Sequence, residues 1–138
     1  MLKLGGYLNI LIAVMHIVGL IWIKEMFEVT GIDKEMSEVA SIHFMIPYML
    51  TIFVAIFFFI FGLYGLSGAN TFRELPFLKH IILIISIIYL LRGIGGLLFD
   101  FVVGDIVYLQ TFYSLMAVFI GLLYLFGGLK RLKVRNAS

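Results

Sequence analysis

Four polar side chains lie inside long apolar stretches of this sequence, and their types could do chemistry. They are Asn9, His16, Arg92 and Gln110. Arginine keeps its charge in proteins, and a charged side chain within a membrane span usually faces the interior of a helix bundle. The position of Arg92 within a span therefore predicts a binding site for a carboxylate, a phosphate or a polarised carbonyl. The alternative is an ion pair near the membrane surface with Asp100 or Asp105.

Several polar residues are predicted to lie at the same depth as Arg92. At 1.5 Å per helical residue, one layer lies about 10 Å below one edge of the membrane. This layer contains His16, Thr51, Arg92 and Ser114. Helical spacing also places Tyr89 on the face of Arg92, and Gln110 on the face of Ser114. The sequence thus predicts a ligand-binding lining made by Arg92, His16, Gln110, Ser114, Tyr89, Thr51, Tyr113 and His43.

The histidines offer further alternatives for a site. His16 and His43 would be the axial ligands of a haem, and with Glu38 they would form a zinc or copper site. The two histidines differ in depth by about two helical turns, and each is also explained as a hydrogen-bonding or boundary residue. We therefore assign no metal ligand and leave the cofactor open.

The composition excludes several classes of protein. Of 138 residues, 63% are hydrophobic, 13% are charged and none is cysteine, and the net charge is +2. The lack of cysteine excludes disulfides, thiolate metal sites and cysteine nucleophiles. The charge is too small to indicate a nucleic-acid-binding protein. No His-Glu-x-x-His or Gly-x-Ser-x-Gly motif is present, so we assign no catalytic residue and expect a non-enzymatic role.

Such a composition is typical of a membrane protein rather than a soluble domain. About 20 apolar residues of helix cross a bilayer. The stretches of this length are 4–23, 44–66, 80–99 and 107–129. They predict an all-α fold, a single domain over residues 1–138, in which sequential helices pack up-down-up-down as a four-helix transmembrane bundle.

The basic residues predict the orientation of the chain. Seven of the ten fall on one side of the predicted spans: Lys3, Arg73, Lys79, Lys130, Arg131, Lys133 and Arg135. Cytoplasmic segments carry such an excess, so both termini and the basic tail 130–138 are predicted to be cytoplasmic. The acidic segment 24–43 is then an outer loop. Its three- and four-residue apolar spacing predicts a short amphipathic helix or an extension of the second span.

Part of the chain carries a resemblance to known proteins. The stretches are Phe61-Gly-Leu-Tyr-Gly-Leu-Ser-Gly-Ala-Asn70, Arg73-Glu-Leu-Pro76 and Ile88-Tyr-Leu-Leu-Arg92-Gly93. Together they resemble small bacterial four-helix membrane proteins and are loosely similar to the DoxX-like group. The resemblance covers about a third of the chain, in spans two and three. It implies a four-helix bundle in the bacterial inner membrane and brings no catalytic residues.

These observations lead to one expected function and several alternatives. We expect binding or translocation of a hydrophobic, amphipathic or anionic small molecule, such as a lipid or a quinone-like compound, in the outer half of the bundle. Aromatic residues make up 16% of the chain and suit an apolar pocket. The main alternative is an accessory subunit or homo-oligomer that packs through a small-residue stripe, Ser114, Ala117 and Gly121. A membrane enzyme, a haem or metal protein and a channel are further alternatives.

Overall fold

The computed structural model describes residues 1–103 and 108–135, and every regular element in these ranges is a helix. The elements are α1 (Leu2–Gly19), the 3-10 helix η1 (Leu20–Trp22), α2 (Ile23–Thr30), α3 (Asp33–Ile42), α4 (Ile46–Gly68), α5 (Leu78–Val103) and α6 (Tyr108–Arg135). Four helical segments are long and apolar enough to cross a membrane: α1 with its continuation to Thr30, α4, α5 and α6. The predicted all-α fold with four spans is confirmed. The first residue of the predicted fourth span, Val107, and the tail residues 136–138 lie outside the described ranges.

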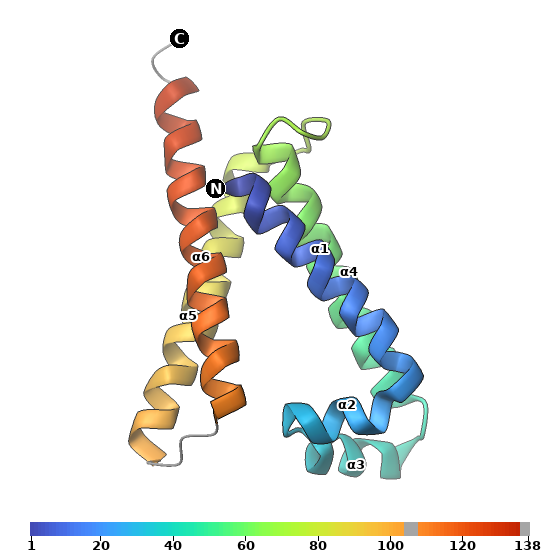
Figure 1. Ribbon diagram of the computed structural model, residues 1–138. Helices are drawn as coiled ribbons and strands as arrows, with labels where there is room; N and C mark the ends of the chain where they lie inside the picture. Colours follow the sequence, from blue (N-terminus) through green and yellow to red (C-terminus); the bar gives the residue numbers. More distant parts are fainter. Residues whose placement is uncertain (104–107, 136–138) are drawn as a thin grey trace.

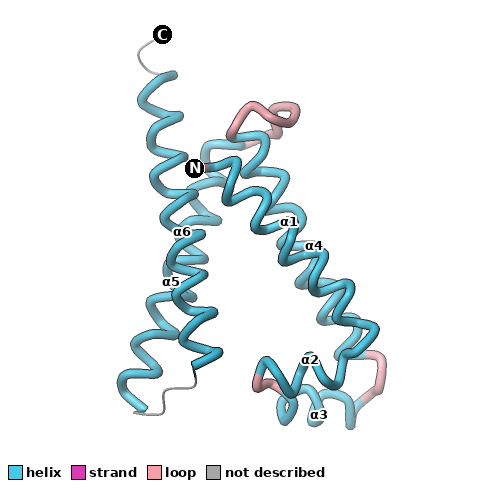
Figure 2. The backbone as a smooth tube through the Cα atoms, in the orientation of Figure 1, coloured by secondary structure: helices cyan, strands magenta, loops and turns pink. Residues whose placement is uncertain are grey.

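The four long helices form two antiparallel pairs, α1 with α4 and α5 with α6 (Figure 1). Each pair joins helices that are sequential spans, as predicted. The two pairs meet at the end of the molecule where α1 begins and α4 ends, here called the terminal end. They diverge toward the opposite end, where α2 and α3 lie, here called the hairpin end (Figure 2). The bundle is therefore two helix pairs joined at one end.

Glycines set the close approach of the two helices within each pair. A Cβ atom on Gly6 of α1 would lie 2.9 Å from both the carbonyl oxygen of Gly62 and the amide nitrogen of Leu66 on α4. A Cβ on Gly93 of α5 would lie 2.7 Å from the carbonyl oxygen of Ser114 on α6. In both pairs, backbone packs directly on backbone, which is the use of small residues expected in a membrane helix pair.

The acidic segment forms two short helices, α2 and α3, where the sequence predicted one helix or a longer span. The chain bends after α1 at Trp22, whose φ is −123° and ψ is 50°. It turns again at Gly31, which has a φ of 73° in the left-handed region that glycine adopts readily. On α2, Ile23 and Phe27 are buried while Glu25 and Glu28 are exposed. The expected amphipathic character is present, and Gly31 is the reason that it is divided between two helices.

Candidate ligand-binding site

A buried hydrogen-bond network joins all four long helices where the two pairs meet. The Tyr89 hydroxyl on α5 donates to the side-chain oxygen of Asn9 on α1. The Asn9 amide nitrogen donates to the Gly5 carbonyl at 2.9 Å and to the Tyr124 hydroxyl of α6 at 3.3 Å. The Tyr124 hydroxyl donates to the Phe61 carbonyl of α4 at 2.6 Å. We call Asn9, Tyr89 and Tyr124 the Asn9 network.

The Asn9 network is complete without a ligand. Asn9 and Tyr124 have 0% relative exposure and Tyr89 has 7%. The rings of Tyr89 and Tyr124 stack with their centroids 6.5 Å apart. Tyr89, which the sequence placed in the ligand lining beside Arg92, is thus held in a structural contact, because its hydroxyl is the group that reaches Asn9.

Arg92 lies on α5 just beyond this network, toward the hairpin end. Its side chain is exposed and extends along the helix to Gly96, one turn further on. A Cβ atom built on Gly96 would lie 3.0 Å from the Arg92 Nη1 atom. The Ser114 hydroxyl of α6 occupies the same place over Gly96. The structure therefore brings Arg92 and Ser114 to one level, as the predicted layer requires, and the missing side chain of Gly96 makes the room.

The next turn of α5 carries a buried carboxylate. Asp100 is 8% exposed and accepts a hydrogen bond from the Thr111 hydroxyl of α6 at 2.7 Å. Arg92, Gly96 and Asp100 are spaced by four residues and so share one face of α5. With Thr111 and Ser114 they form a polar strip along the α5–α6 contact, here called the polar seam: Arg92, Gly96, Asp100, Thr111 and Ser114.

The sequence predicts Asp100 and Asp105 as alternative ion-pair partners of Arg92. In the described ranges no Asp or Glu oxygen lies within 4.0 Å of the Arg92 guanidinium, and the carboxylate of Asp100 is held by Thr111 instead. Asp105, the other candidate partner, lies outside the described residues. Within those residues, Arg92 is a cation in a span with no carboxylate beside it.

The residues predicted from the first two spans lie on the other helix pair. The Nδ1 atom of His16 lies 2.8 Å from the Ile12 carbonyl, and its ring lies 5.1 Å from that of Phe58 on α4. Thr51 is buried and donates to the Pro47 carbonyl of its own helix at 2.9 Å. Since Thr51 and Phe58 are seven residues apart on α4, about 10 Å, His16 and Thr51 lie at different levels.

Three other predicted residues lie toward the hairpin end. His43 is exposed, stacks on Phe44 and accepts a hydrogen bond from the Met45 amide at 3.2 Å. Tyr113 is 38% exposed and its ring lies near that of Phe112. The Gln110 amide nitrogen would lie 3.6 Å from a Cβ on Gly31. The turn between α2 and α3 therefore reaches the start of α6.

The histidines do not assemble a metal site in the part of the chain that the structure describes. No group of three or more His, Asp or Glu side chains there could hold a metal ion. The alternative set of His16, His43 and Glu38 is thus not brought together, because His16 packs on Phe58 within the α1–α4 pair and His43 lies at the exposed junction of α3 and α4.

The small-residue stripe of α6 is used inside the molecule. Ser114 and Ala117 are 2% and 8% exposed, and a Cβ on Gly121 would meet the side chain of Leu90 at 2.9 Å. This stripe, which the sequence offered to a partner helix, packs against α5. An accessory subunit would need another surface for its partner.

Sequence reasoning missed Tyr124 and Thr111 and did not assign a role to Arg131. Tyr124 lies three residues after Gly121 and seven after Ala117, so helical spacing places it on the same face of α6 as the small-residue stripe. That spacing was the available signal, but the predicted stripe was not extended to Tyr124. Thr111 follows Gln110 near the start of the fourth span, and Asp100 lies near the end of the third. Their closeness in the sequence was a signal that the two side chains could pair.

No protein-family model, no curated protein and no solved structure matches this chain.

Proposed function

We propose that this protein binds an anionic or carbonyl-bearing amphipathic small molecule between its two helix pairs at the hairpin end, with Arg92 holding the polar head. The location we propose is the bacterial inner membrane, with the hairpin end outside. The observation that supports this most strongly is the position of Arg92 in a span, exposed and without a carboxylate within 4.0 Å among the described residues.

The cost of placing this charge supports a functional role. An arginine at the centre of a span costs about 2.5–3.5 kcal/mol on insertion scales. An ion pair would offset part of this cost, but the one described carboxylate on the same face, Asp100, is bonded to Thr111. A ligand carboxylate or phosphate would supply the missing partner, and guanidinium binds such groups with two parallel hydrogen bonds.

The arrangement of the helices favours a ligand at this level. Asn9 on α1 and Phe58 on α4 both contact Tyr89 on α5, and these contacts join the two pairs. The pairs diverge toward the hairpin end (Figure 2), and the polar seam begins at Arg92, three residues after Tyr89 on α5. The seam provides the exposed Arg92 cation, with the buried Ser114 hydroxyl at the same level. These groups match an amphipathic molecule with an acidic or carbonyl head.

A stability comparison tests this function. A ligand that binds only the folded protein raises its stability by roughly 2.7 kcal/mol at a hundred times its Kd. We expect the gently purified wild type to have a Tm several degrees above that of Arg92→Ala. After exhaustive delipidation the difference should largely disappear. Arg73→Ala, which removes an arginine outside the spans, should match wild type throughout. A difference that persists unchanged after delipidation would make Arg92 a structural residue.

A further inference from the structure

At the terminal end, a groove of about 590 Å³ lies where three long helices converge. Its walls come from the start of α1, the end of α4 with the turn that follows, and the last turns of α6. The lining residues are Met1, Leu2, Lys3, Gly68, Ala69, Asn70, Gly127, Lys130 and Arg131. Leu2 forms part of its apolar floor and packs so closely that a Cβ on Gly127 would lie 2.6 Å from its Cγ.

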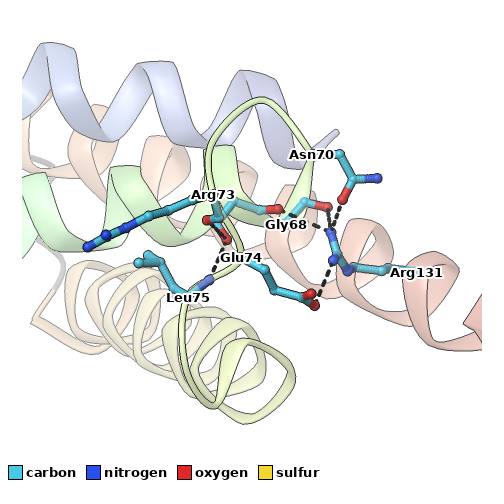
Figure 3. Close-up of polar contacts among 7 residues, drawn as sticks. Gly68, Asn70, Arg73, Glu74, Leu75 and Arg131 are labelled. Atoms are coloured by element: carbon cyan, nitrogen blue, oxygen red, sulfur yellow. Dashed lines mark hydrogen bonds and ion pairs between the residues drawn. The ribbon is translucent and has the colours of Figure 1, made fainter.

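One wall of the groove is fixed by Arg131. Its Nη1 donates to the carbonyls of Ser67 and Gly68 at 3.1 and 2.6 Å and to the side-chain oxygen of Asn70 at 2.8 Å. Its Nη2 forms an ion pair with Glu74 at 3.2 Å (Figure 3). Both carbonyls lie in the last turn of α4, where carbonyls lack partners within the helix, and the Ser67 carbonyl also accepts the Asn70 amide at 3.1 Å. Arg131 thus ties α6 to the end of α4, and its charge is balanced by Glu74.

The remaining charge of the groove is positive. Lys3 and Lys130 line it from α1 and α6, and within the described ranges neither forms an ion pair. None of the described residues that line the groove is acidic. Because Asn70 receives the Arg131 hydrogen bond on its oxygen, its amide nitrogen is left as a donor. The groove therefore offers two ammonium groups and an amide donor above an apolar floor.

The position of the groove indicates where its ligand comes from. It lies at the ends of three apolar helices, and the adjoining segment 69–77 exposes two aromatic rings, Phe72 at 41% and Phe77 at 78%. Aromatic and lysine side chains at the ends of spans mark the membrane–water boundary. Lipid phosphates lie at this depth. We propose that the groove binds the phosphate of an anionic phospholipid, with Lys3 and Lys130 as the charged contacts.

Lipid retention in native mass spectrometry tests this proposal on the full chain. Detergent-purified protein is mixed with phosphatidylglycerol or phosphatidylcholine. We expect wild type to retain one phosphatidylglycerol in preference to phosphatidylcholine. The double variant Lys3→Gln, Lys130→Gln should lower this preference at least about fivefold, since each lysine near an anionic surface is worth about that factor. Arg131 is left unchanged because its loss would disturb the end of α4.

The control removes the same charge elsewhere. Lys34→Gln with Lys79→Gln, lysines outside the groove, should leave the preference unchanged. An equal loss in the control, or equal retention of the two lipids by wild type, would overturn the proposal. Inorganic phosphate retained by delipidated wild type without any preference for phosphatidylglycerol would overturn the lipid assignment. The groove is at the opposite end from Arg92, so Arg92→Ala should leave this preference intact even if the proposed function is wrong.

Discussion

The hydroxyl of Tyr89 on α5 donates a hydrogen bond to the side-chain oxygen of Asn9 on α1, and this contact joins the two helix pairs. The same asparagine donates to Tyr124, which in turn donates to the Phe61 carbonyl. Asn9 therefore links α1 to α5 and α6, and Tyr124 extends the network to α4. The position of Arg92, three residues beyond Tyr89 on α5, is set by this contact.

Replacing Asn9 with leucine should destabilise the protein by about 1–3 kcal/mol. The change removes two interhelical hydrogen bonds, each worth about 0.6–1.7 kcal/mol in a membrane protein, and leaves the buried Tyr89 hydroxyl without its acceptor. Equilibrium unfolding in mixed micelles would measure the loss. Thr51→Val is the matched control, because the buried Thr51 hydroxyl bonds only within its own helix. Equal losses in the two variants would contradict the linking role of Asn9.

Glycine substitutions should separate positions of close helix contact from open ones. Gly6→Ala places a methyl group 2.9 Å from backbone atoms of α4, so we expect a loss of about 1–3 kcal/mol from forced separation of the helices. Gly95→Ala meets no atom within 4 Å and should be neutral or stabilising by up to about 1 kcal/mol through helix propensity. Thermal unfolding of both variants in the same detergent is the measurement. A stable Gly6→Ala variant would show that α1 and α4 do not pack through backbone contact.

The predicted orientation can be tested because the chain has no cysteine of its own. A cysteine placed at Lys34 in α3 should react with a membrane-impermeant maleimide in intact bacterial cells. A cysteine placed at Arg73, in the turn after α4, should react only after the membrane is permeabilised. The positive-inside rule gives this result. The reverse labelling pattern would place the hairpin end in the cytoplasm and move the proposed ligand site to that side.

The sequence predicted the helices better than it predicted their contacts. Long apolar stretches have few alternatives in a membrane, so the four spans were found with their ends displaced by a few residues. Arg92 and Ser114 lie at one level, as predicted, because the backbone of Ser114 packs on Gly93 and its hydroxyl lies over Gly96. His16 and Thr51 are separated by the segment 24–43, whose helical turn at Gly31 gives no such constraint.

The Asn9 network could not be found by periodicity alone. Apolar and aromatic residues cover nearly every face of these helices, so the spacing of Tyr124 carries little information on which neighbour it meets. The closeness of Tyr124 to Asn9 depends on Gly5 and Gly65, whose Cβ atoms would lie 2.7 and 2.5 Å from its ring and hydroxyl. Such contacts can be predicted only when the way in which α1, α4 and α6 cross is known.

Native mass spectrometry of the gently purified protein, wild type beside Arg92→Ala, would decide most directly whether Arg92 holds a ligand. We expect a small molecule of defined mass on wild type, at least tenfold depleted in Arg92→Ala. Asp100→Asn should retain it, because the Asp100 carboxylate is bonded to Thr111 and leaves Arg92 unaltered. Bare protein in both wild type and Arg92→Ala, or equal amounts of the same molecule on both, would contradict a binding role for Arg92.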